Sequence, residues 1–142
     1  PVINDEITYK FEIGKGVELR PGKDITIIAT GLPVSESLEA AKFLAEDGID
    51  AQVINIHTIK PLDEELVVKA AQATGRVFTV EEHSIIGGLG SAVMECLAEK
   101  NPVKVTRIGV RDTFGESGPA KDLLHKYELD AEGIYKQIKA AL

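Results

Sequence analysis

Four short apolar segments, rich in β-branched residues, alternate with helix-like segments along this chain, and this alternation limits the possible folds more than any other feature. The strand-like segments are residues 24–30, 50–56, 76–82 and 103–110. Each has the length and composition of a buried strand. Strands separated by helices of about 10 to 15 residues pair in parallel through right-handed crossovers. The sequence therefore predicts a three-layer αβα domain of the α/β class, with helices on both faces of a mostly parallel sheet.

The helix-like segments carry their own start and stop signals. Pro33 suits the first turn of one helix, and Gly48 stands where that helix should end. Asp63 is the expected N-cap of a second helix, which Gly75 should close. The other predicted helical segments are a third helix carrying Val93, Cys96 and Leu97, a short stretch at residues 120–128, and a last helix that starts at Asp130 and carries Ile134 and Ile138.

Length and charge limit the classes of function. A chain of 142 residues favours a single domain. Its formal net charge of -7 comes without any Lys/Arg cluster, so the electrostatic footprint of a nucleic-acid-binding protein is missing. No apolar run approaches the roughly 20 residues that span a bilayer, and no signal region opens the chain. We therefore expect no nucleic-acid or membrane partner and a cytoplasmic location.

The chain opens without Met, and its first residues mix turn formers with charged residues before any regular pattern begins. We expect residues 1–8 to be the remnant of a linker from an upstream segment and residues 9–142 to form the domain.

A segment with three glycines, "EEHSIIGGLG" at residues 81–90, follows a predicted strand and precedes a predicted helix. Ligands of parallel sheets gather at the carboxyl ends of the strands, so the position permits a site. The backbone N–H groups of Gly87, Gly88 and Gly90 could bind an anion at a helix N-terminus. The spacing matches neither GxGxxG nor GxxxxGK[ST], however. We therefore favour a tight turn and close helix packing, with a stand-alone phosphate- or nucleotide-binding module as the alternative.

The polar residues of this region are candidates for an anion site or an interface rather than for catalysis. Glu81 and Glu82 are adjacent on a strand, so their side chains should point to opposite faces of the sheet and cannot act as a facing pair. His83 has no nucleophile beside it, and Arg111 follows the next strand end. Glu82, His83 and Arg111 therefore join the three glycines as candidates, and no residue is assigned a catalytic or metal-binding role.

Three segments together resemble the carboxy-terminal domain of transketolases, most closely the separate carboxy-terminal subunit of transketolases encoded in two pieces. They are "DITIIATG...V.ESLEAAKFLAEDGIDAQVINIHTIKPLD" at residues 24–63, "VFTVEEHSIIGGLGSAVMECLAE" at residues 77–99, and "FGESG" at residues 114–118. The resemblance runs from Tyr9 to Leu142. It implies a five-stranded sheet with four parallel strands and one antiparallel strand, the latter within residues 15–20.

The resemblance also implies a division of labour in the parent enzyme. In such enzymes thiamine diphosphate and magnesium lie between a diphosphate-binding and a pyrimidine-binding domain, usually across a homodimer interface, and the third domain supports assembly. The GDG motif of the diphosphate-binding domain is missing here. We therefore expect no cofactor in this piece and no activity from it alone, within a parent that transfers a two-carbon ketol unit between sugar phosphates. The related domains of 1-deoxyxylulose-5-phosphate synthases and of 2-oxo acid dehydrogenase beta subunits share the "VEE...GG.G" pattern and are the alternative parents.

Overall fold

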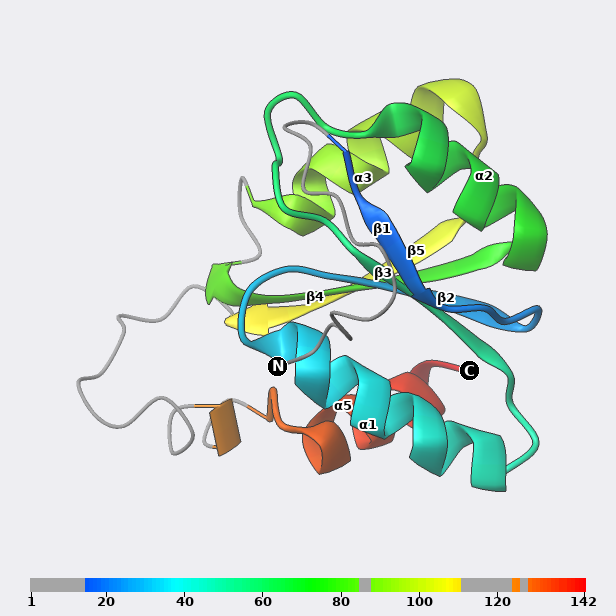
Figure 1. Cartoon of the computed structure of the whole chain (residues 1–142), viewed down its shortest axis with the longest axis vertical. Helices are drawn as coiled ribbons and strands as arrows, with labels where there is room; N and C mark the ends of the chain where they lie inside the picture. The colour runs from blue at the N-terminus through cyan, green and yellow to red at the C-terminus, as the bar shows by residue number, and fades with distance from the viewer. Residues whose placement is uncertain (1–14, 85–87, 111–123, 126–127) are drawn as a thin grey trace, which may run out of the picture.

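A computed structural model describes residues 15–84, 88–110, 124–125 and 128–142 of the chain. Within it, five strands form one sheet in the order β1-β3-β2-β4-β5 (Figure 1). β1 runs antiparallel to β3, whereas the neighbouring pairs β3–β2, β2–β4 and β4–β5 are parallel. The mixed sheet and the position of its antiparallel strand confirm the predicted fold. The strand bounds are β1 Val17–Arg20, β2 Ile25–Ala29, β3 Ala51–Asn55, β4 Arg76–Ser84 and β5 Lys104–Val110.

Helices cover both faces of this sheet, which confirms the three predicted layers. α1 and α5 lie on one face, and α2 and α3 lie on the other (Figure 1). Of the short helical stretch expected at residues 120–128, only 124, 125 and 128 belong to the described residues. No helix of the described part is long and apolar enough to cross a membrane. The helix bounds are α1 Pro33–Glu46, α2 Glu64–Thr74, α3 Leu89–Lys100 and α5 Ala131–Ala141.

The predicted helix caps are present. The Asp63 carboxylate accepts a hydrogen bond from the Leu66 N–H at 3.3 Å, and α2 ends at Gly75, whose φ of 74° is left-handed. The Asp130 carboxylate accepts from the Gly133 N–H at 2.9 Å and so starts α5. α1 ends at Glu46, and Gly48 follows with a φ of 79°. These caps define the helix ends because they satisfy backbone groups that have no partner within the helix.

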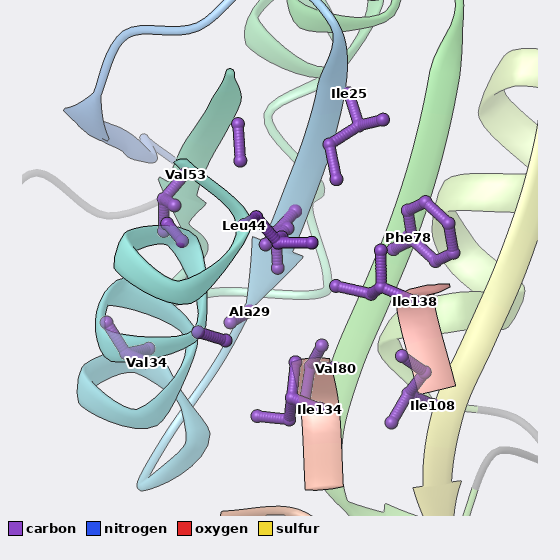
Figure 2. Packing of buried hydrophobic residues seen from close by; sticks show 14 of the residues in the cluster. Ile25, Ala29, Val34, Leu44, Val53, Phe78, Val80, Ile108, Ile134 and Ile138 are labelled. Carbon is purple, nitrogen blue, oxygen red and sulfur yellow. The ribbon is translucent and has the colours of Figure 1, made fainter. Parts of the chain in front are cut away.

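Two apolar cores lie on the two faces of the sheet. Ile27 belongs to the core beneath α1 and α5, whereas its neighbour Ile28 belongs to the core beneath α2 and α3. Both are fully buried, as expected for consecutive residues of a central strand that is covered on both sides. Figure 2 shows the first core, in which Leu44 of α1 and Ile138 of α5 pack toward the sheet. The chain therefore completes its own hydrophobic interior on both faces.

The order of the parallel strands reverses direction between β2 and β4. The chain passes from β2 to β3 on one side, and then returns to β4 on the other side of β2. The crossovers that leave β2 and β4 therefore diverge, and the crevice beyond their carboxyl ends is a topological switch point. Thr30 and Gly31 follow β2 at this point, and Glu81 and Glu82 lie in the last part of β4.

Candidate functional site

The side chains of the two glutamates near the end of β4 lie on opposite faces of the sheet, as predicted for adjacent residues of a strand. Glu81 contacts the first residues of α3, on one face. Glu82 lies against Gly31, which leads into α1 on the other face. The same dipeptide therefore brings one carboxylate to the start of each of two helices.

Glu81 is a buried carboxylate whose two oxygens accept hydrogen bonds from the start of α3. Its side chain is 1% exposed, and its two oxygens accept hydrogen bonds from the Leu89 and Gly90 N–H groups, each at 2.8 Å. The N-cap residue of α3, Gly88, makes no side-chain cap bond. Glu81 thus supplies from the neighbouring strand the negative charge that a helix N-terminus favours. Since the Gly90 N–H already binds this internal anion, it is not free to bind an external one.

Gly90 also lies too close to the sheet for any side chain. A Cβ atom there would stand 2.7 Å from Arg107 Cγ and 2.9 Å from Thr79 Oγ1. The first turn of α3 therefore rests directly on β4 and β5, a packing that only glycine permits without a shift of its neighbours. These contacts support close packing, rather than ligand binding, as the reason for this glycine.

Glu82 differs from Glu81 because its carboxylate accepts no hydrogen bond from the described residues. It is partly buried, and it makes no hydrogen bond or ion pair with the part of the chain that the structure describes. Its Oε1 atom stands 2.5 Å from the point where a Cβ of Gly31 would lie. Gly31 has a φ of 71°, which also favours glycine. The Glu82 carboxylate therefore contacts the backbone of Gly31 at the switch point of the sheet.

Gly31 and His57 were missed by sequence reasoning. Gly31 could have been found from its position, because it lies between a predicted strand and the helix that begins at Pro33. His57 follows β3 at the same carboxyl edge, and partial burial lowers the pKa of its imidazole. Because burial penalises the charged form, this ring is a poor source of positive charge for an anion at neutral pH.

The remaining sequence candidates divide into two groups. Gly88 is the N-cap residue of α3, with extended backbone and its carbonyl accepting from the Ala92 N–H at 3.1 Å. Gly87, Arg111 and the side chain of His83 lie outside the described residues. Their roles as anion or interface residues stay predictions.

Comparison with known proteins gives consistent results. The family model for the transketolase carboxy-terminal domain matches residues 14–134. The chain is 52% identical, over 133 residues, to the 6-deoxy-6-sulfo-D-fructose transketolase subunit SqwH of Clostridium sp. strain MSTE9, a match that covers 94% of this chain and 40% of that protein. It is 44% identical over 140 residues to 1-deoxy-D-xylulose-5-phosphate synthase 1 of Geobacter sulfurreducens, covering 97% of this chain and 22% of that protein.

A solved structure shares the fold closely. It is described as a split gene transketolase, an inactive beta4 tetramer, and matches with a TM-score of 0.90 and 48% identity over 100% of this chain and 46% of its own. The chain thus spans less than half the length of each of these relatives. The family match over most of the chain, together with the shared fold, shows that the protein belongs to the transketolase carboxy-terminal domain family.

Proposed function

We propose that this chain is the non-catalytic carboxy-terminal domain of a thiamine-diphosphate-dependent transketolase, of the type in which the enzyme is divided between polypeptides. Its role is to support assembly of the enzyme. The edge of its sheet at the carboxyl ends of the parallel strands borders the domains that carry out the reaction. The support is its likeness to a transketolase subunit and to a split gene transketolase, each of which is more than twice as long as the match.

The observation that carries this proposal is the Glu81 carboxylate at the N-terminus of α3. A diphosphate needs amide N–H groups or cations, and the Leu89 and Gly90 amides already bind Glu81. Glu82, the other carboxylate at this edge, would repel a diphosphate. No cluster of three metal-ligating side chains occurs among the described residues. The described residues at this edge therefore do not fit the diphosphate of the cofactor, and no chemical step is assigned to them.

In the proposed parent, the diphosphate-binding and pyrimidine-binding domains hold thiamine diphosphate and magnesium and transfer a two-carbon ketol unit between sugar phosphates. The parent is proposed to be a cytoplasmic homodimeric enzyme of the pentose phosphate type. The support for the thiamine-dependent ketol transfer is the family membership of this chain together with the transketolase names of its relatives.

A turnover assay tests this division of labour. With ribose 5-phosphate, xylulose 5-phosphate, thiamine diphosphate and magnesium, the chain alone should give no product. Adding the diphosphate-binding and pyrimidine-binding domains, on the polypeptide or polypeptides that carry them, should restore ketol transfer. Turnover by the chain alone would contradict the proposal.

A second parent is favoured by one observation, the 44% identity to a 1-deoxy-D-xylulose-5-phosphate synthase. The product of the assembled enzyme separates the two parents. If the complex makes 1-deoxyxylulose 5-phosphate and transfers no ketol unit between sugar phosphates, the domain belongs to a synthase of that class. The domain's supporting role would be the same in either parent.

A further inference from the structure

Two identical side chains at the end of β4 are used in different ways. Glu81 accepts two backbone hydrogen bonds and is 1% exposed. Glu82 is partly buried and has no polar partner in the described ranges. A carboxylate that loses part of its hydration without gaining a hydrogen bond carries an electrostatic cost, which a cation can offset. Of the two adjacent glutamates, Glu82 is therefore the one without a polar partner among the residues that the structure describes.

The Glu82 carboxylate lies against the backbone of Gly31. Gly31, at a left-handed φ of 71°, leaves room for it, since a Cβ atom there would stand 2.5 Å from Glu82 Oε1. Leu32, the next residue, is 49% exposed although it is a large apolar side chain. Figure 1 shows the start of α1 beside the end of β4, at the left of the view. Glu82 lies against Gly31, and Leu32 follows Gly31 in the chain, so this pair of Glu82 and Leu32, here called the switch-point anchor, combines a carboxylate with an exposed apolar residue.

Lysine and arginine side chains match this combination. Their aliphatic stems cover apolar surface while their charged heads pair with a carboxylate. Glu36, in the first turn of α1, adds a further negative charge on the helix that starts at the anchor. The whole chain has a formal net charge of -7. This edge thus favours a basic partner and disfavours an acidic one.

A second copy of this chain is the less suitable partner. In a two-fold interface centred on this patch, the two Glu82 carboxylates would lie near each other across the axis, and their like charges oppose such a contact. The rest of the parent enzyme suits the patch better, because the relatives of this chain carry the domain as 40% to 46% of a longer polypeptide.

We infer that Glu82, with Leu32 beside it, is the anchor that receives a lysine or arginine side chain from the polypeptide forming the rest of the enzyme. The inference rests on the proposed function and assigns the contact through which the domain recognises its partner. Glu82 is a docking residue in this view and takes no part in the chemistry.

The test measures how tightly this chain binds the diphosphate-binding and pyrimidine-binding domains, supplied on the polypeptide or polypeptides that carry them. Calorimetry at low and at physiological salt gives the dissociation constant and its salt dependence. Glu82→Gln should weaken binding about tenfold at low salt and flatten the salt dependence, because a charge pair is lost. Leu32→Ser should weaken binding while keeping the salt dependence.

Glu65→Gln on α2 is the matched control. Glu65 is exposed, lies on the opposite face, and loses the same charge on substitution. It should bind like the wild type. All three variants should melt within a few degrees of the wild type, which separates docking from folding.

Each other outcome has a definite meaning. If the wild type binds and Glu82→Gln binds equally well with the same salt dependence, the anchor is wrong while the proposed function stands. If the wild type does not bind the partner polypeptide at all, both fail. If Glu82→Gln alters self-association of the isolated chain in sedimentation instead, a second copy is the occupant and the inference is overturned.

Discussion

The carboxylate of Glu81 shows how much one buried side chain can do for a helix. It binds the Leu89 and Gly90 N–H groups, which would otherwise be buried donors without acceptors. Each such donor costs about 1–3 kcal/mol when it is left unpaired. With two such donors, Glu81→Ala should lower the free energy of unfolding by about 2–6 kcal/mol, measured by urea denaturation.

Glu81→Gln should cost less than Glu81→Ala, because one oxygen remains to accept a hydrogen bond. Glu82→Gln, one residue along the strand, is the control, since Glu82 has no hydrogen bond in the described structure to lose. Equal losses from Glu81→Ala and Glu82→Gln would show that the contacts of Glu81 with α3 contribute little to stability.

Helix α5 depends on a charged cap, and this dependence predicts a response to pH. Partial burial works to raise the pKa of Asp130, but hydrogen bonds from His125 and Gly133 outweigh it and hold the pKa below its usual value. A carboxyl whose pKa is lowered by folding stabilises the folded state above its usual pKa. That contribution is lost as the pH falls from about 4 through the lowered value.

Asp130→Asn tests this response, since asparagine caps a helix about as well as aspartate but carries no charge. Free energies of unfolding measured between about pH 6 and about pH 3 should fall less steeply in the variant than in the wild type. Parallel curves would mean that the charge of Asp130 does not contribute to stability.

The domain has two apolar cores that share one sheet, and this arrangement predicts a single cooperative unfolding transition. Ile27 and Ile28 are neighbours on β2 and fully buried, but they pack on opposite faces. Ile27→Ala and Ile28→Ala should each lower the free energy of unfolding by about 2–5 kcal/mol. Because both cores depend on the same strand, circular dichroism and Cys96 accessibility should report one transition in both variants.

A variant in which the α2–α3 face unfolds before the α1–α5 face would contradict this coupling. Cys96 is the probe because it is buried on the α2–α3 face, at 5% exposure. Early thiol labelling in Ile28→Ala, at a denaturant concentration where the helical signal is mostly kept, would be that outcome.

Local sequence signals were sufficient for the four parallel strands and the helices that cover them, for physical reasons. Apolar runs of strand length, capping residues such as Asp63 and Asp130, and the glycine at position 75 act within a few residues of themselves. The antiparallel strand was less local, and its prediction came from the resemblance to transketolases. The opposite directions of Glu81 and Glu82 also followed from sequence, because strand side chains alternate.

Only the tertiary structure decided what those two glutamates do. That Glu81 binds the start of α3 depends on how closely α3 approaches the sheet, which Gly90 permits. That Glu82 lies on Gly31 depends on β2 and β4 being neighbours, and those residues are about fifty positions apart in the chain. Sequence patterns report the direction of a side chain from its own strand, but its partner is set by which distant elements pack beside it.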